Sequence, residues 1–374
     1  MRLALVYRRL ARGGGTEADL YRTAEVLATR GHDVHLFCAQ LRSAAPPGVT
    51  VHRVPTVAAG RVARLLSFAW AAPRWTARAG PWDVIVGFGR TAHQDLVRCG
   101  GGTHRAYLET MRAFGARRRS RGPYHRAVMW LEERQFRPQN HRRVLAVSRR
   151  VAGEIRAGYG VSAEHIQVIY NGVDLDRFDP VRCAADRAAV RSALRIPESA
   201  RVVLSVGSGF RRKGVDSLLE LWRRDAPRDT WLVVVGDDER LGAYRRVAGR
   251  RDLRGRVLLP GPQVAVEGFY AAADAVVVAS LQEAFGNVVL EAMACGRPVV
   301  TSAQVGAAEL LDGELRDLIV DRPDDLAGLR ARLEVALDED ANERASRARQ
   351  TAERHPWTRH FDELERLLAV TANA

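Results

Sequence analysis

Short apolar runs alternate with helix-like stretches along this chain, and the pattern occurs twice. β-branched and aliphatic residues form the runs, and polar or glycine-containing segments separate them, which is typical of parallel strands joined by helices. The runs cover residues 3–7, 34–37, 51–54, 84–86 and 144–147 in the first half, and residues 202–206, 231–235, 256–259, 275–278 and 299–300 in the second. The sequence therefore predicts an α/β fold with two parallel sheets, each a doubly wound, Rossmann-like domain.

The length supports two domains, because 374 residues exceed what one ordinary hydrophobic core encloses. The segment Tyr170–Pro180 contains the turn-forming pair Asn171 and Gly172, so we expect the domain linker there. The predicted domains are residues 1–168 and 169–356. Open α/β sheets bind ligands at the carboxyl ends of their strands, so two such domains predict a binding cleft where they face each other.

The C-terminal residues 357–374 are expected to form a helix that crosses back to the N-terminal domain. Apolar side chains recur along it at helical spacing, so the helix needs a surface to cover. These residues are Phe361, Leu364, Leu367 and Leu368.

The composition calls for an anionic partner. The formal net charge is +14 and the pI is near 10.6, which suits nucleic acid, anionic lipid or a phosphorylated glycan. No apolar stretch approaches the roughly 18 residues of a membrane span, and we expect Met1–Tyr7 to be the first strand rather than a signal peptide. The four cysteines are far apart and lack C-x-x-C spacing, which disfavours disulfides or zinc and suits a reducing cytosol.

Lysine occurs once in the chain, at Lys213, whereas the other 57 of the 58 basic residues are arginines. An ammonium group is compact and flexible, so a lysine kept in an arginine-rich chain indicates a place where a planar guanidinium does not fit. Chance survival of one lysine is the alternative.

Three segments combine residues that suit a phosphorylated ligand. The first contains Gly13, Gly14 and Gly15 before a helix expected over residues 18–30, and glycines there let the backbone and helix amides approach an anion or a sugar oxygen. Three consecutive glycines do not match the G-x-G-x-x-G dinucleotide fingerprint, and a turn without a ligand is the alternative.

The second segment opens the C-terminal domain with Gly207, Ser208, Arg212, Lys213 and Gly214. A small-residue turn follows a strand, and two arginines and the lysine stand just before a helix, which suits a diphosphate. A P-loop would continue from lysine to serine or threonine, so the glycine that follows here disfavours an NTPase. Solvated surface charge is the alternative.

The third segment runs from Glu283 to Glu291. Glu283 is expected on a loop and Glu291 about two helical turns further on, with Phe285, Gly286 and Asn287 offering backbone amides between them. Carboxylates accept hydrogen bonds from vicinal hydroxyls, so the pair suits a sugar and a ribose. The alternative is that Glu291 pairs with a neighbouring arginine.

These residues resemble a known family. The pattern Glu-x-Phe-Gly-x-x-x-x-Glu from Glu283, the Arg-Lys-Gly block at Arg212, and Asn171-Gly172-Val173-Asp174 are similar to the retaining GT-B glycosyltransferases of family 4. The resemblance spans most of the chain and is strongest over residues 172–298. The sequence around Lys213 is similar to that of the lipopolysaccharide-core glucosyltransferases of Gram-negative bacteria.

The resemblance implies a retaining, metal-independent transfer of a hexose from a nucleotide diphosphate sugar, with UDP-glucose as the expected donor and no cofactor. It assigns Arg212 and Lys213 to the diphosphate, Glu291 to the ribose and Glu283 to the hexose. The remaining contacts that it implies are the amides of Phe285, Gly286 and Asn287 at the distal phosphate, Gly207 and Ser208 at the donor, and Gly14 and Gly15 beneath the donor.

A catalytic histidine is also implied, and His104 is favoured over His93 because glycines precede it. A structural role for His104 stays open. Asp174 and Asp176 form an Asp-x-Asp, but they lie in the expected linker rather than in a metal-binding position, so no metal site is expected.

The segment Arg112–Arg150 holds twelve arginines against Glu132 and Glu133, with Phe114, Tyr124, Met129, Trp130 and Phe136 among them. Basic residues around aromatics suit an anionic membrane surface, where each charge contributes roughly 1 kcal/mol. We therefore expect a cytoplasmic enzyme at the inner face of the cytoplasmic membrane, acting on a lipid-linked glycan such as lipopolysaccharide core. General arginine bias is the alternative.

Two other function classes are weighed against the transferase. A nucleotide-sugar epimerase or hydrolase of the same fold would share the diphosphate site but would consume donor without an acceptor. A nucleic-acid-binding protein would explain the charge but would leave the Glu283 and Glu291 pair without a purpose, so no nucleic acid is expected.

Overall fold

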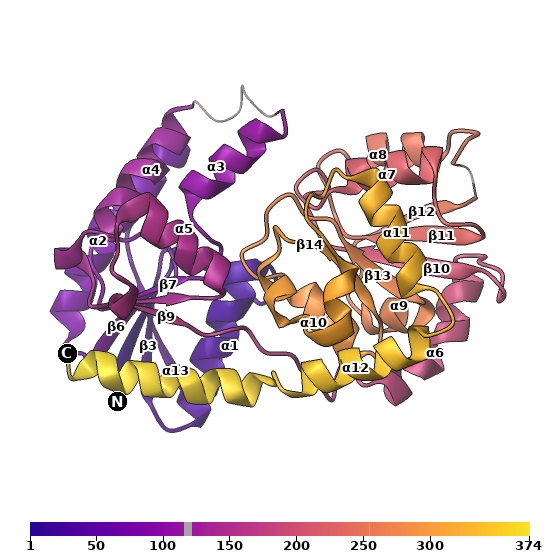
Figure 1. Ribbon diagram of the computed structural model, residues 1–374. Helices are drawn as coiled ribbons and strands as arrows, with labels where there is room; N and C mark the ends of the chain where they lie inside the picture. Colours follow the sequence, from indigo (N-terminus) through magenta and orange to yellow (C-terminus); the bar gives the residue numbers. More distant parts are fainter. Residues whose placement is uncertain (116–121, 254) are drawn as a thin grey trace. The chain divides into compact units, whose positions relative to one another are not determined.

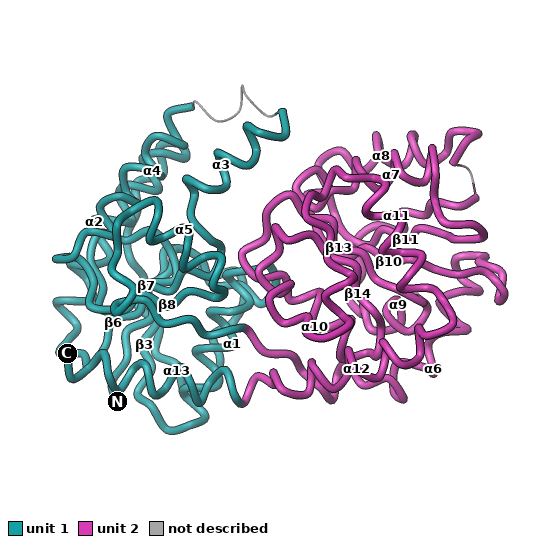
Figure 2. The backbone as a smooth tube through the Cα atoms, viewed as in Figure 1, with its two compact units in different colours: residues 1–170, 359–374 teal, residues 171–358 magenta. Residues whose placement is uncertain are grey.

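The computed structural model describes residues 1–115, 122–253 and 255–374 (Figure 1). The chain divides into two compact units (Figure 2). Unit 1 contains residues 1–170 and 359–374, and unit 2 contains residues 171–358. The junctions between the two units lie after residues 170 and 358, whereas the sequence placed the domain junctions after residues 168 and 356.

Unit 1 is built on a seven-stranded parallel sheet, and a short parallel pair, β2 and β4, stands beside it. The strand order in the sheet is β5-β3-β1-β6-β7-β8-β9. The strands of unit 1 are β1 Arg2–Val6, β2 Arg9–Leu10, β3 Asp33–Cys38, β4 Gln40–Leu41, β5 Val49–Arg53, β6 Val84–Gly87, β7 Leu96–Cys99, β8 Arg143–Ala146 and β9 Ile166–Val168.

Helices connect these strands and cover both faces of the sheet, with α2 and α4 on one side and α1 and α13 on the other (Figure 1). Between α2 and the sheet lies a core that includes Val6, Phe37 and Phe68. The helices of unit 1 are α1 Gly15–Thr29, α2 Gly60–Ala79, α3 His104–Ala113, α4 Pro123–Gln135, α5 Arg149–Tyr159 and α13 Trp357–Ala372, with the 3-10 turns η1 Pro138–Asn140 and η2 Ala163–His165.

Unit 2 repeats the architecture with a six-stranded parallel sheet in the order β12-β11-β10-β13-β14-β15. Its central strand β13 is buried along its whole length, which explains why it is an unbroken apolar run. The strands are β10 Arg201–Val206, β11 Thr230–Val235, β12 Val257–Gly261, β13 Ala275–Val278, β14 Val299–Ser302 and β15 Ile319–Val320.

The helices of unit 2 follow the strands in the same alternating order. Among them, α7 follows β10 directly, and α10 follows β13. They are α6 Pro180–Ala193, α7 Val215–Arg224, α8 Leu241–Ala248, α9 Glu267–Ala272, α10 Asn287–Ala294, α11 Leu326–Ala336 and α12 Ala341–Glu353, with the 3-10 turns η3 Gly306–Leu310 and η4 Gly313–Leu318.

The predicted α/β fold class with two Rossmann-like sheets is confirmed. The predicted runs correspond to β1, β3, β5, β6, β8 and β10 to β14, whereas β7, β9 and β15 and the pair β2 and β4 were not predicted. In β7 the apolar run is interrupted by Arg98, which is buried and paired with Asp19 of α1. In a pattern of apolar and polar residues, a charged residue predicts an exposed position, so this strand was missed.

The last helix returns to unit 1, where its apolar face is covered as expected. Phe361, Leu364, Leu367 and Leu368 are buried. Polar contacts reinforce the packing: His360 Nδ1 lies 2.7 Å from the carbonyl oxygen of Tyr170, and Arg142 donates to the carbonyl of Thr371 at 3.2 Å.

Both sheets have a point where the strand order reverses. In unit 2, β11 and β12 extend on one side of β10, and the chain then crosses to place β13 on the other side. In unit 1, β1 and β6 have the same relation. Loops that leave two such adjacent strands diverge, so ligands of open α/β sheets bind there.

Candidate active site

The loop after β10 places the only lysine of the chain over a glycine. Gly207 has φ +143°, and a Cβ atom there would lie 2.6 Å from Cε of Lys213. A side chain at position 207 would therefore collide with the lysine, which is itself only 8% exposed. Backbone contacts fix the loop: Phe210 N donates to Asp238 Oδ2 at 2.8 Å, and Asp237 N donates to Ser208 Oγ at 3.1 Å.

The loop after β13 brings a carboxylate onto both cations of the first loop. Glu283 Oε2 lies 2.7 Å from Lys213 Nζ and 2.5 Å from Arg212 Nη1. The backbone of Glu283 is anchored, because its N–H donates to Gln304 at 3.1 Å and its carbonyl accepts from Gly306 at 3.1 Å. Two adjacent strand ends thus present two positive charges and one negative charge at one point.

The ion pairs dominate the acidity of Glu283. Burial alone would raise the pKa of this carboxyl group, but Lys213 and Arg212 outweigh burial and lower it to about 2. Glu283 is therefore ionised throughout the neutral range. The pairing was not predicted, since the sequence suggested separate partners for Glu283 and for the cations.

The helix α10 begins at the same strand end. Gly286 is its N-cap residue with φ +94°, and a Cβ atom there would lie 2.9 Å from Val305 Cγ1, so the position favours glycine. Phe285 is buried, and its carbonyl accepts from Ala307 N at 2.8 Å. Asn287 Oδ1 accepts from Asn171 Nδ2 at 2.9 Å. The helix dipole makes this end attractive to an anion.

Glu291 lies further along α10 and is held by a tyrosine. The hydroxyl of Tyr270, a fully buried residue of α9, donates to Glu291 Oε2 at 2.7 Å. Burial, together with the charge of Glu291, raises the pKa of Tyr270 well above its ordinary value, so the tyrosine stays a donor. Tyr270 did not belong to the predicted site.

In unit 1, the predicted glycines follow β2, the short strand after β1, and lead into α1. Gly14 is the N-cap residue of α1 and has φ +99°, a conformation that favours glycine. Gly15 is the first residue of that helix. The helix N-terminus formed by Gly14 and Gly15 is thus suitably built for close approach of a ligand.

His104 is the first residue of α3, and its ring is paired with a second histidine. His104 Nε2 lies 3.0 Å from Nδ1 of His125 on α4, and the two rings are stacked at 5.1 Å. Burial, then the charge of Arg90, lowers the pKa of His104 to about 4, so the imidazole is neutral at physiological pH. No motif or residue spacing in the sequence indicated His125.

A buried carboxylate supports the N-terminus of α3. Glu132 of α4 is 3% exposed and accepts from His104 N at 2.8 Å, Arg105 N at 3.2 Å and Arg90 Nη2 at 3.1 Å. The hydroxyl of Tyr159 donates to it as well. Glu132 was predicted only as one of two acids in a basic segment, and its role as a cap could not be foreseen from a lone charge.

The basic segment Arg112–Arg150 has several environments. Residues 116–121 lie outside the described residues. Phe136 is buried with β8 in unit 1, so this part of the segment is not available to a surface, whereas Trp130 on α4 is 43% exposed. Trp130 lies 6.1 Å from the exposed Trp70 of α2, and Arg134 stacks over Trp70 at 4.7 Å.

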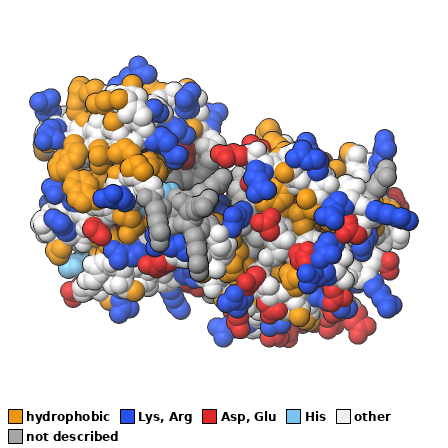
Figure 3. Space-filling model, turned by 90° about the horizontal axis from the view of Figure 1, so that it is seen from above, with side chains coloured by type: hydrophobic (Ala, Val, Ile, Leu, Met, Phe, Trp, Pro, Cys, Tyr) orange, Lys and Arg blue, Asp and Glu red, His pale blue; other side chains and the backbone are white. Residues whose placement is uncertain are grey.

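Space-filling Figure 3 shows hydrophobic side chains gathered on one face of unit 1 with basic side chains around them. The helix α2 contributes Trp70, Trp75 and four arginines and contains no acid. We call the exposed aromatic and basic side chains of α2 and α4 the α2/α4 surface. No helix in the described ranges is long and apolar enough to cross a membrane.

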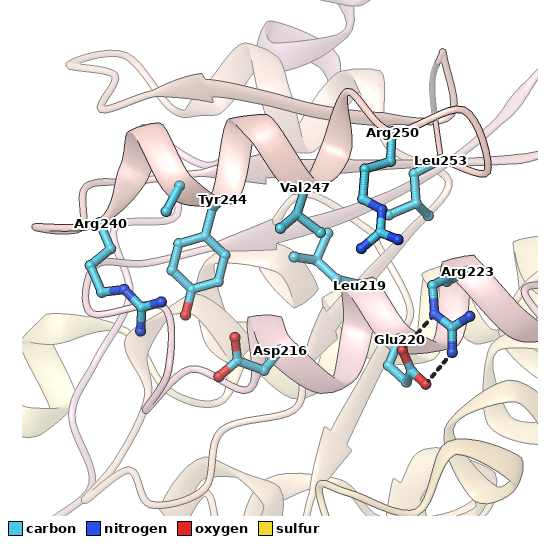
Figure 4. Close-up of a pocket in the computed structure, with 10 residues that line it drawn as sticks. Asp216, Leu219, Glu220, Arg223, Arg240, Tyr244, Val247, Arg250 and Leu253 are labelled. Atoms are coloured by element: carbon cyan, nitrogen blue, oxygen red, sulfur yellow. Dashed lines mark hydrogen bonds and ion pairs between the residues drawn. The ribbon is translucent and has the colours of Figure 1, made fainter.

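Two further features bear on ligands. A hollow of about 230 Å³ lies between α7 and α8, lined by Asp216, Tyr244 and Arg240 among others, and none of the predicted site residues lines it (Figure 4). Within the described part of the chain, no three His, Cys, Asp or Glu side chains are grouped as a metal site would require. Asp174 Oδ1 instead accepts from Arg177 N at 2.9 Å.

Two Rossmann-like units with loops suited to ligands where the strand order reverses are what the resemblance to GT-B glycosyltransferases implies. Comparison with known protein families supports this assignment. The model of the family described as "Glycosyl transferases group 1" matches residues 186–355, and the "Glycosyltransferase Family 4" model matches residues 13–177.

Individual relatives span most of the chain. A probable transglycosylase of Burkholderia thailandensis is 31% identical over 90% of this chain and 86% of its own length. The lipopolysaccharide glucosyltransferase WaaG of Escherichia coli is 26% identical over 80% and 79%. A crystal structure of WaaG superposes with a TM-score of 0.78 at 23% identity, covering 95% and 96% of the two chains.

The chain belongs to glycosyltransferase family 4, also called group 1, and is a glycosyltransferase of GT-B fold.

Proposed function

We propose that the chain is a retaining, metal-independent hexosyltransferase that moves glucose from UDP-glucose onto a membrane-associated glycan, with lipopolysaccharide core as the preferred acceptor. The observation that carries the proposal is the convergence of Arg212, Lys213 and Glu283 at two adjacent strand ends in unit 2. Similarity to the glucosyltransferase WaaG supports the choice of sugar and acceptor.

The two cations bind the diphosphate of the donor. Phosphate oxygens form charge-assisted hydrogen bonds with guanidinium and ammonium groups, so they compete with Glu283 for Arg212 and Lys213. When the donor displaces Glu283 from the cations, the carboxylate becomes an acceptor for hexose hydroxyls. The ion-paired arrangement of Arg212, Lys213 and Glu283 is thus the ligand-free state of the site.

The remaining donor contacts come from backbone and from Glu291. Gly207 and Ser208 lie beside Lys213, and the amides of Phe285, Gly286 and Asn287 receive the distal phosphate at the start of α10. Glu291 accepts the two ribose hydroxyls, since each carboxylate oxygen can accept from a vicinal diol.

Positive charge replaces a metal in the chemical step. As the bond between the anomeric carbon and the phosphate oxygen breaks, negative charge develops on the diphosphate, and Lys213 and Arg212 stabilise it. The acceptor hydroxyl attacks the same face of the sugar and gives its proton to the departing diphosphate oxygen, so configuration is retained. Unit 2 is the donor domain in this proposal, and unit 1, with Gly14, Gly15 and His104, is the acceptor domain.

The α2/α4 surface brings the enzyme to its acceptor. Tryptophan side chains favour the membrane interface, and arginines are attracted to anionic headgroups. The site of action is then the inner face of the cytoplasmic membrane. This proposal moves the membrane contact from the whole segment Arg112–Arg150 to the exposed faces of α2 and α4.

A donor screen tests the proposal. Thermal shift with UDP-, GDP- and ADP-sugars is followed by transfer assays on lipopolysaccharide from truncated-core strains, with the anomeric configuration of the product read by NMR and with excess EDTA as a metal control. The proposal predicts stabilisation by UDP-glucose and a product with retained configuration in EDTA. Donor consumption that does not depend on acceptor would instead indicate a hydrolase or epimerase.

A further inference from the structure

A second group of charged side chains lies beside Glu291 in unit 2. Arg177, in the segment that follows the start of unit 2, contacts Glu267 of α9 through its Nε atom. Tyr270 stands one turn after Glu267 on the same helix and donates to Glu291 of α10. Neither Arg177 nor Glu267 has a place in the donor contacts proposed above.

The Arg177 guanidinium forms an ion pair with Glu267, and its charge also reaches Glu291. Burial would lower the pKa of Arg177, but Glu267 and then Glu291 raise it, so the positive charge acts on both acids. Oxygen Oε2 of Glu267 is buried and accepts no hydrogen bond from the residues that the structure describes. Neutralisation of Glu267 therefore depends on Arg177.

The position of Arg177 is set by the linker segment itself. Its N–H donates to Asp174 Oδ1 at 2.9 Å, and Phe178 N donates to the Asp174 carbonyl at 3.0 Å. The ring of Phe178 meets Tyr270 edge-on, with centroids 5.7 Å apart. The linker, α9 and α10 are thus connected through contacts that end at Glu291.

We propose that Arg177 is a positioning residue for the donor nucleotide: its ion pair with Glu267 holds α9 in place, so that Tyr270 keeps the Glu291 carboxylate aligned to accept hydrogen bonds from the two ribose hydroxyls. The inference rests on the proposed function, in which Glu291 binds the ribose. Without Arg177, Glu267 would lose its ion-pair partner and α9 would lose a contact with the linker, so the Tyr270 hydroxyl would no longer hold the Glu291 carboxylate in a fixed position. A carboxylate that is not held in place accepts hydrogen bonds from two vicinal hydroxyls less well.

The test is calorimetric titration of the full-length protein with UDP, GDP and ADP, after which the tightest ligand is compared with its 2′,3′-dideoxy form. The variants are Arg177→Met, Glu291→Gln and the double variant. Arg182→Ala is the matched control, because Arg182 is an exposed arginine of the neighbouring helix α6 whose side chain donates to the carbonyl of Asp176.

Arg177→Met is expected to weaken binding of the ribonucleotide about tenfold, the effect of losing one charge-assisted contact, and to change binding of the dideoxy form less than about twofold. In the Glu291→Gln background, Arg177→Met should add little. Arg182→Ala should leave both affinities unchanged. If Arg177→Met does not fold, Arg177→Gln provides the same comparison.

Equal weakening for both nucleotides, or additive effects of the two substitutions, would overturn the inference and leave the proposed function standing. Failure of the folded wild type to bind any of the three diphosphates would overturn the proposed function and the inference together.

Discussion

The carboxyl ends of the two sheets are equipped differently. In unit 2, Lys213 and Arg212 form ion pairs with Glu283, which a diphosphate would replace in the proposed function. In unit 1, His104 is a neutral ring, and the nearby carboxylate of Glu132 is occupied by backbone and side-chain donors. Cations whose ion pairs can be exchanged for a ligand suit a phosphate group. A neutral site whose side chains are held in place suits sugar hydroxyls.

The largest effect is expected from a substitution in the charged site of unit 2. Lys213→Ala should lower turnover by about a hundredfold or more, because one charge partner of the departing diphosphate is lost. Lys213→Arg should not restore it, since the lysine stem packs against Gly207, where a bulkier planar head has little room. Steady-state kinetics with UDP-glucose measure both variants.

The matched control is Arg211→Ala, which removes an exposed arginine of the same loop. Turnover within about twofold of wild type is expected for this change, in keeping with most surface substitutions. Equal losses in Arg211→Ala and Lys213→Ala would reduce the effect to net charge and remove the site assignment.

His104 tests the other half of the comparison. His104→Ala should lower turnover about tenfold, as for loss of one hydrogen bond to the sugar, and should leave UDP affinity unchanged. The two readouts separate unit 1 from unit 2. A lower melting temperature with unchanged turnover would make His104 structural.

The α2/α4 surface sharpens the difference between the units, because the exposed tryptophans belong to unit 1. Trp70→Ala combined with Trp130→Ala should weaken binding to vesicles that contain anionic phospholipid by roughly fivefold, through lost interfacial contact. Sedimentation with such vesicles measures the change. A matched pair in unit 2, Val181→Ala with Val264→Ala, removes exposed apolar groups and should have no effect.

The smallest effect concerns the acidity of His104. Its folded-state pKa of about 4 lies below the ordinary value of 6.5, so the unfolded chain takes up a proton first as pH falls. The stability that neutral His104 contributes is fully present above pH 6.5 and is lost between pH 6.5 and about 4.

His104→Gln should therefore flatten the fall in melting temperature over this interval, by about 2 °C. The charged and titratable groups that face the ring include Arg90, Glu132, His125 and Tyr107. Identical slopes in wild type and variant would show that the His104 ring is solvated and not held neutral by its surroundings.

The fold was predictable because nearly every strand of both sheets is a distinct apolar run. The exceptions have local causes: β7 contains the buried Arg98, and β9 and β15 are short. A pattern of polarity cannot distinguish a buried charge that has a partner from an exposed one.

The candidate site was predictable as a set of loops but not as a set of contacts. Motif spacing indicated Lys213 and Glu283, yet their ion pair depends on the parallel pairing of β10 with β13 and on the backbone of Gly207. His125, Glu132, Tyr270 and Arg177 are single residues on helices or the linker, so only the folded chain reveals them.

The charge triad of unit 2 is tested most directly by UDP titration of Glu283→Gln. In the ligand-free protein this carboxylate is paired with Lys213 and Arg212, so the phosphates of UDP must displace it when they bind. Its replacement by a neutral amide should therefore tighten UDP binding about tenfold. Glucose transfer should fall, because the contact with the hexose is lost. Weaker or unchanged UDP binding in a folded variant would contradict the account.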